Sequence, residues 1–125
     1  MLKQIDFYAL TNFSIPETGK VQAEIKLDAQ HGIFKGHFPD NPVVPGVCLI
    51  QISKEMLEKS LNTTTQLTQS SQVKFLAVVD PTVNAVLQIA LDTKEHDGLI
   101  SVNAAISAGE KVFFKFKGVF KRDNG

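Results

Sequence analysis

A histidine, a stiff loop and the start of an apolar helix follow one another in the first half of the chain. The run from Gly36 to Val47 holds three prolines and two glycines, so it cannot continue a regular helix or strand. His37 can take or give a proton near neutral pH. The N–H groups that open a helix carry a partial positive charge, which suits a carbonyl that becomes an oxyanion. This combination predicts a site for proton abstraction beside a carbonyl or thioester, the alternative being a loop that only turns a corner.

The composition is typical of a soluble globular protein with one domain, residues 1–125. Of the 125 residues, 43% are hydrophobic and 21% are charged. Thirteen basic and thirteen acidic side chains balance, which argues against a nucleic-acid partner. We find no apolar stretch near the ~20 residues of a membrane span, and no long apolar segment at the N-terminus. A cytoplasmic location without membrane contact is therefore expected.

The remaining reactive side chains do not form a second pattern. Cys48 is the single cysteine, so no internal disulfide can form, and on the apolar start of a helix it is expected to be a small core residue. His31 lies six residues before His37, but nothing nearby completes a set of metal ligands. No metal and no cofactor are expected. His96 lies in a charged turn and is expected to be exposed.

The periodicity of apolar residues predicts one central helix and a mainly antiparallel sheet. Residues 1–18 fit a helix or a strand equally well, and residues 21–27 alternate as a half-buried strand does. Residues 47–61 predict a helix whose first half is buried on all sides. The polar tract 62–66 ends this helix. Short turns join the later segments into an antiparallel sheet of about five strands, an α+β arrangement. The later strands are predicted at residues 72–79, 83–91, 100–106 and 112–120.

Three short motifs follow one another in the segment from Gly36 to Val47: Gly36-His37-Phe38-Pro39, Pro42 and Pro45-Gly46-Val47. Together they resemble the active-site segment of the β-hydroxyacyl-acyl-carrier-protein dehydratases, which belong to the hot-dog fold superfamily. The later Val73-Lys74-Phe75-Leu76, followed by Val79-Asp80-Pro81, also looks like that family's strand after the helix. The resemblance implies a central helix wrapped by an antiparallel sheet. It also implies a homodimer or higher homo-oligomer with active sites at the subunit interface.

The resemblance further implies a lyase of fatty-acid or related acyl-chain synthesis. Such enzymes remove water from a 3-hydroxyacyl chain held as a thioester on acyl carrier protein. In this chain His37 would take the C2 proton, and the Val47 N–H after Gly46 would bind the thioester carbonyl. A helix carboxylate of the partner subunit would assist departure of the hydroxyl, and Gln51 stands at that position. The candidates for the walls of an acyl tunnel are Phe34, Phe38 and Phe75.

The amide of Gln51 leaves other functions open. It can donate and accept hydrogen bonds, but it has no acidic proton to give. The alternatives are a hot-dog thioesterase or isomerase, and a non-catalytic partner of acyl carrier protein whose companion supplies the carboxylate. Glu55 lies one turn further along the same helix face, about 6 Å away along the axis. Glu55 and Asp40 are expected to be solvated charges. The alternatives are that Glu55 substitutes for the helix carboxylate missing at position 51, and that Asp40 orients the ring of His37.

Overall fold

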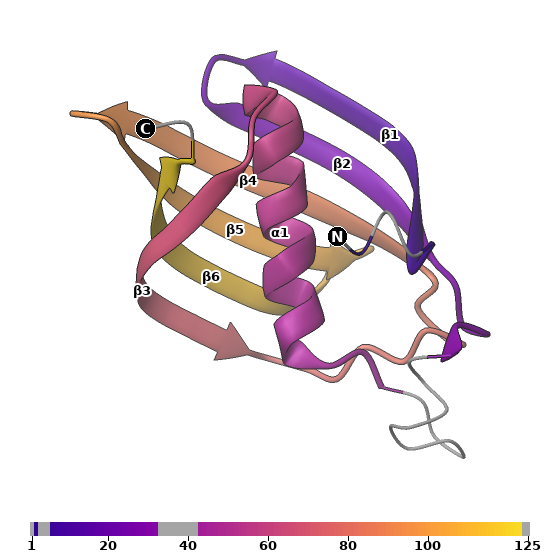
Figure 1. Ribbon diagram of the computed structural model, residues 1–125. Coiled ribbons are helices and arrows are strands. Elements are labelled where there is room, and N and C mark those ends of the chain that lie inside the picture. The colour runs from indigo at the N-terminus through magenta and orange to yellow at the C-terminus, as the bar shows by residue number, and fades with distance from the viewer. Residues whose placement is uncertain (1, 3–5, 33–42, 124–125) are drawn as a thin grey trace.

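The computed structural model describes residue 2, residues 6–32 and residues 43–123. In this part of the chain six strands form one antiparallel sheet, and a helix lies across one of its faces (Figure 1). The helix is α1 (Gly46–Leu61). The strands are β1 (Tyr8–Glu17), β2 (Lys20–Leu27), β3 (Thr65–Phe75), β4 (Val86–His96), β5 (Leu99–Ala108) and β6 (Lys111–Arg122). The expected helix wrapped by an antiparallel sheet is confirmed.

The order of the strands in the sheet determines where α1 begins and ends. The strands follow the order β1-β2-β4-β5-β6-β3, so β1 and β3 are the two edges. Because β2 precedes α1 and β3 follows it, the chain crosses the face of the sheet between them. Asn62 ends the helix in a left-handed conformation, and Glu58 Oε2 then accepts the Thr65 N–H at 2.6 Å. This contact ties the end of α1 to the start of the edge strand β3.

Alternation along the strands produces the core. In β2, buried Val21, Ala23, Ile25 and Leu27 alternate with residues that are more exposed. The strand predicted at residues 112–120 lies within β6, where Phe114, Phe116 and Phe120 are buried and their rings form a row. The side of α1 that faces the sheet contributes Cys48, Leu49, Ile52, Met56 and Leu57 to the same core.

Two edge regions differ from the sequence-based expectation. Residues 1–18, which fitted a helix or a strand, contain the edge strand β1, and the sheet has six strands rather than about five. The strand expected at residues 72–79 begins at Thr65 and ends at Phe75. Nearly every side chain of β3 is exposed, so no alternation in the sequence indicates its start. At its end, the Leu76 and Ala77 N–H groups both donate to the Phe113 carbonyl, which takes the chain out of the strand.

The hairpin between β4 and β5 is tighter than the sequence suggests. The charged turn expected around His96 contains only Asp97 and Gly98, whose φ angles are 54° and 78°. Positive φ at both central residues is the geometry of a type I′ turn. The preceding charged residues belong to β4, and Glu95 pairs there with Arg122 of β6. His96 is exposed, as expected. Within the described ranges, α1 is neither long nor apolar enough to cross a bilayer.

Candidate active site

The site expected from the sequence lies only partly within the described residues. His37, Phe34, Phe38 and Asp40 fall outside them, and their roles stay predictions. The description resumes at Val43, immediately before the start of α1. From the expected set, the structure therefore places Gly46, Val47, Gln51 and Phe75.

The N-terminal end of α1 carries the polarity that an oxyanion needs. Pro45 is the N-cap residue, no side chain there forms a cap hydrogen bond, and the first turn contains no acidic residue. The Val44 N–H donates to the Val79 carbonyl at 2.9 Å, which anchors the chain just before the helix. Val47 is 73% exposed, so the expected burial of the whole first half of the helix was wrong at this position. The helix start is thus open to a ligand on the side of Val47.

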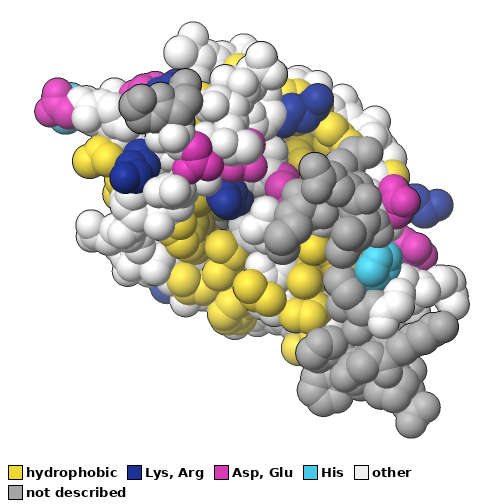
Figure 2. All heavy atoms as spheres, in the orientation of Figure 1, with side chains coloured by type: hydrophobic (Ala, Val, Ile, Leu, Met, Phe, Trp, Pro, Cys, Tyr) yellow, Lys and Arg dark blue, Asp and Glu magenta, His cyan; other side chains and the backbone are white. Residues whose placement is uncertain are grey.

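Gly46 and Phe75 meet at an apolar pocket beside this helix start. A Cβ atom on Gly46 would lie 2.7 Å from two ring atoms of Phe75, so the ring occupies space that only glycine leaves. The pocket has a volume of about 230 Å³ and is lined by Val43, Val44, Gly46, Leu49, Phe75, Ala77, Val78 and Val79. Phe75 is 57% exposed, and Figure 2 shows hydrophobic side chains gathered over the end of β3 and the start of α1. An acyl chain would find apolar contacts here, although binding by Gly46 and Phe75 stays a prediction.

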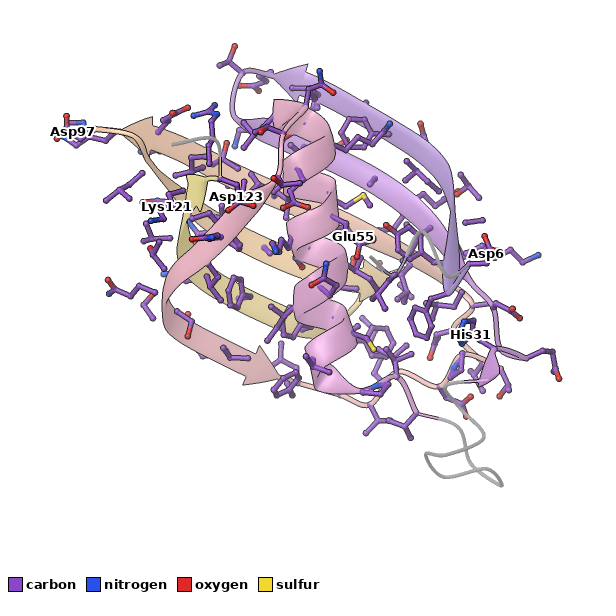
Figure 3. The ribbon with its side chains drawn as sticks, viewed as in Figure 1. Asp6, His31, Glu55, Asp97, Lys121 and Asp123 are labelled. Carbon is purple, nitrogen blue, oxygen red and sulfur yellow. The ribbon has the colours of Figure 1, made fainter. Side chains whose placement is uncertain are left out.

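Gln51 belongs to a hydrogen-bonded group centred on Glu55. Gln51 Nε2 donates to Glu55 Oε2 at 2.9 Å, and the Leu2 N–H donates to the same oxygen at 2.8 Å. Tyr8 Oη donates to Glu55 Oε1 at 2.8 Å. Glu55 projects from α1 toward β1 (Figure 3), and only 8% of it is exposed. The expectation that Glu55 is a solvated charge was therefore wrong, because Tyr8 of β1 and the backbone of Leu2 cover it.

The charge of Glu55 shapes the acidity of its neighbours. Burial, the hydrogen bond to Glu55 and the carboxylate charge together raise the pKa of the Tyr8 phenol well above its ordinary range. Burial, and secondarily the charge of Glu55, raises the pKa of the Cys48 thiol. Cys48 lies in the core, as expected, and a thiol that holds its proton is a poor nucleophile. Tyr8 and Leu2 were not singled out from the sequence, where they have no periodic or motif signal.

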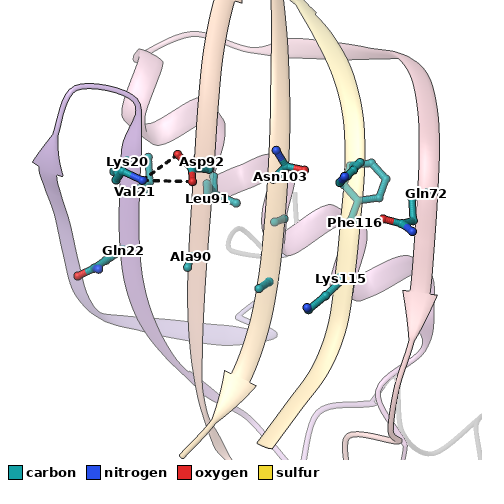
Figure 4. A pocket seen from close by; sticks show the side chains of 13 residues that line it. Lys20, Val21, Gln22, Gln72, Ala90, Leu91, Asp92, Asn103, Lys115 and Phe116 are labelled. Carbon is teal, nitrogen blue, oxygen red and sulfur yellow. Dashed lines mark hydrogen bonds and ion pairs between the residues drawn. The ribbon is translucent and has the colours of Figure 1, made fainter. Parts of the chain in front are cut away.

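The other histidines and hollows do not add to this site. His31 packs edge-on against Phe7, with 5.6 Å between ring centroids, and its backbone N–H bonds to Asp28. In the described ranges no three His, Cys, Asp or Glu side chains are grouped closely enough to hold a metal ion. A larger hollow, about 410 Å³, lies on the face of the sheet opposite α1 (Figure 4). Its lining includes the Lys20–Asp92 ion pair but none of the residues expected in the active site.

Comparison with known proteins identifies the family. The sequence profile of the ApeI-like family, described as ApeI dehydratase, matches residues 14–115. The chain belongs to this family. The dehydratase FabZ of a Thermoanaerobacter species, a 3-hydroxyacyl-(acyl-carrier-protein) dehydratase, is 29% identical to this ApeI-like chain over 104 residues. The match covers 77% of this chain and 72% of that enzyme. FabZ of Levilactobacillus brevis is 37% identical over an alignment of 87 residues, and the match covers 63% of this chain and 57% of that enzyme.

Solved structures show that this ApeI-like chain has the hot-dog fold. The dehydratase heterocomplex ApeI:P from Xenorhabdus doucetiae matches with a TM-score of 0.74 and 20% identity, covering 91% of this chain and 97% of that one. A hypothetical thioesterase with coenzyme A from Streptococcus pneumoniae matches with a TM-score of 0.62 and 15% identity, covering 93% and 88%. At these identities the likeness shows the fold alone, and the residues of this chain must carry any argument about its chemistry.

Proposed function

We propose that this ApeI-like chain dehydrates 3-hydroxyacyl thioesters of acyl carrier protein, releasing the enoyl thioester and water. Membership in the ApeI-like dehydratase family carries the proposal. The relatives named FabZ supply the substrate class, since their name specifies 3-hydroxyacyl chains on acyl carrier protein. An open helix start, an apolar pocket at Gly46 and a hydrogen-bonding side chain at position 51 support it further.

In the proposed mechanism His37 is the base. It takes the C2 proton while the C2–H electrons form the C2=C3 bond and the C3–O bond breaks. The Val47 N–H at the helix start donates a hydrogen bond to the thioester oxygen and stabilises the negative charge that develops on it. Because the Gln51 amide has no acidic proton, the imidazolium of His37 returns its proton to the departing hydroxyl. Water leaves, His37 is again neutral, and the enzyme is unchanged at the end of the cycle.

A defined substrate tests the proposal. A 3-hydroxyacyl thioester on acyl carrier protein is incubated with the protein, and formation of the conjugated enoyl thioester is followed by its absorbance and by mass spectrometry. We expect enoyl product from the natural chain and at least a hundredfold slower formation from His37→Ala, because loss of the base removes a contribution of about 10²–10⁴-fold. Free thiol instead of enoyl product would identify a thioesterase. Unchanged turnover by the His37→Ala variant would exclude the proposed base.

A second candidate is a subunit of a heteromeric dehydratase whose companion supplies the carboxylate. Gln51 favours it, because the resembling enzymes have an acidic residue there. The structural neighbour ApeI:P is itself described as a dehydratase heterocomplex. If the purified chain forms no enoyl product alone but Gln51→Glu does, the second candidate is supported over the first.

We also propose that the chain forms a homodimer along β3. This strand is an edge of the sheet, and apolar side chains on it and just beyond it are exposed. They are Leu67, Val73, Phe75, Leu76 and Val78. An edge with free backbone groups and apolar side chains is suited to pairing with a second strand. A dimer formed there would have its interface beside the apolar pocket at Gly46.

A further inference from the structure

Glu55 is held by donors from three different parts of the chain. Tyr8 Oη on β1 donates to Oε1, while the Leu2 N–H and Gln51 Nε2 donate to Oε2, all at 2.8–2.9 Å. Each of these three described partners is a donor. An ionised carboxylate, which only accepts, satisfies all three.

This arrangement decides which way the amide of Gln51 points. A carboxylate cannot donate a hydrogen bond, so the NH₂ end of the amide must face Glu55. Oε1 and Nε2 of Gln51 are bonded to the same carbon atom and point in different directions. The carbonyl oxygen is therefore turned away from Glu55, and both N–H groups are on the nitrogen that Glu55 holds. Without this partner, an amide can rotate to present either end.

Glu55 itself is badly placed to touch a substrate. It is buried, both of its oxygens are occupied, and it lies one helical turn beyond Gln51. Among the described partners of Glu55, the side chain that lies nearer the helix start is Gln51, which is one turn after the exposed Val47 and only partly buried.

We propose that Glu55 is a positioning residue that fixes Gln51 with its carbonyl oxygen toward the substrate, so that the site selects 3-hydroxyacyl over 3-oxoacyl thioesters. The inference rests on the proposed function for its substrate class. A 3-hydroxyl group can donate to the fixed Oε1 of Gln51. A 3-oxo group can only accept, so it meets another acceptor and gains no hydrogen bond. A pocket that discriminates by a hydrogen bond rejects the analogue that cannot complete it.

The test compares binding of matched 3-hydroxyacyl and 3-oxoacyl thioesters by calorimetry, alongside steady-state kinetics. We expect the natural chain to prefer the 3-hydroxyacyl compound by about tenfold, the equivalent of one net hydrogen bond. Glu55→Gln should abolish most of this preference, because a side-chain amide can face either end of Gln51. Glu58→Gln is the matched control, since Glu58 lies on the same helix and bonds to Thr65 rather than Gln51. It should keep the preference.

Two further variants keep the proposal falsifiable if Glu55→Gln does not fold. Gln51→Met removes the amide but leaves Glu55 with its other two donors, and it should also lose the preference. The exchange variant Gln51→Glu with Glu55→Gln restores a carboxylate–amide pair with an acceptor toward the substrate, and it should regain the preference. A natural chain without any preference, or a Glu55→Gln variant that keeps it, would overturn the inference. Absence of enoyl product with the binding preference intact would instead count against the proposed dehydration.

Discussion

At the residue scale, the proposed chemistry rests on an amide at position 51, and its neighbour one turn later is a buried carboxylate. The resembling dehydratases place the acid where Gln51 stands. In this chain the carboxylate at position 55 is enclosed by Tyr8 and the backbone of Leu2. The acidic group is thus buried and accepts a hydrogen bond from the Gln51 amide.

Replacing Gln51 by glutamate should strengthen dehydration. The added carboxyl group can protonate the leaving hydroxyl, so we expect about tenfold or more faster enoyl formation, part of what a general acid contributes. The new carboxyl would stand within hydrogen-bonding distance of Glu55, and repulsion between two close carboxylates raises the pKa of one of them. The gain should therefore be present at low pH and fade as the pH rises through that raised pKa. Rates of enoyl formation measured against pH for both proteins check this. Equal or lower rates at every pH, in a variant with unchanged oligomeric state, would contradict it.

The Tyr8 phenol provides a second residue-scale prediction that needs no substrate. Burial first, and then Glu55, raises its pKa. The pKa of Tyr8 is higher in the folded protein than in the unfolded chain, where it is about 10. The contribution of Tyr8 to stability is therefore complete below a pH of about 10 and is lost as the pH rises above it. Tyr8 is the one tyrosine and there is no tryptophan, so tyrosinate absorbance reports this group alone. We expect tyrosinate to form only together with unfolding, as followed by circular dichroism. Ionisation near pH 10 in a chain that is still folded would contradict the described environment.

Residue-scale predictions from the sequence succeeded where the local pattern decided the environment. Cys48 lies in an apolar run and is buried, and His96 lies in a charged segment and is exposed. The same reasoning failed for Glu55, whose partners are 47 and 53 positions away in the chain. No periodicity around a glutamate shows that a tyrosine and a backbone N–H from another segment will cover it.

At the element scale, two glycines that contact phenylalanine rings should respond differently to alanine. A Cβ on Gly46 would meet the ring of Phe75, which is exposed and free to swing aside. A Cβ on Gly118 would lie 2.7 Å from the ring of Phe116, which is buried and closely packed, and 2.9 Å from Leu67. Alanine therefore adds the same methyl group at both positions, next to the exposed ring of Phe75 in one case and next to the buried ring of Phe116 in the other.

We expect Gly118→Ala to lower the free energy of unfolding by about 1–3 kcal/mol, as overpacking in a core does. Gly46→Ala should change stability by less than about 1 kcal/mol but should displace the Phe75 ring into the pocket and raise KM for acyl substrates. Denaturant unfolding and steady-state kinetics measure the two effects. A Gly46→Ala variant with unchanged KM would show that the pocket beside Phe75 does not hold the acyl chain. Equal stability of the two variants would contradict the difference in packing.

The elements themselves were predictable to different degrees. The helix expected at residues 47–61 is α1, because its apolar run and flanking breakers act locally. The edge strand β3 was misplaced because residues 65–72, which are polar except for Leu67, lack alternation, and only pairing with β6 makes them a strand. The position of β3 in the sheet depends on contacts with a segment some fifty residues away, which no local pattern records.

For the whole molecule, the crossing of α1 over the sheet brings the site and the edge of the sheet together. The Val44 N–H bonds to the Val79 carbonyl, so the start of the helix and the segment after β3 lie side by side. Phe75 ends β3 and also lines the pocket. A second subunit paired along β3 would therefore cover exposed apolar side chains and stand next to the helix start.

We expect the chain to be a homodimer at micromolar concentration, as measured by sedimentation. A stable interface needs about 1,200–2,000 Å² of buried surface, which pairing of two eleven-residue β3 strands with their apolar side chains can contribute to. Val73→Lys should shift the protein to monomer, because Val73 is 39% exposed on this strand and a buried lysine without a partner is costly. Leu99→Lys is the matched control, since Leu99 is 45% exposed but lies on β5, inside the sheet. A monomeric natural chain, or a Val73→Lys variant that stays dimeric, would remove β3 as the interface and with it the proximity of a partner subunit to the helix start.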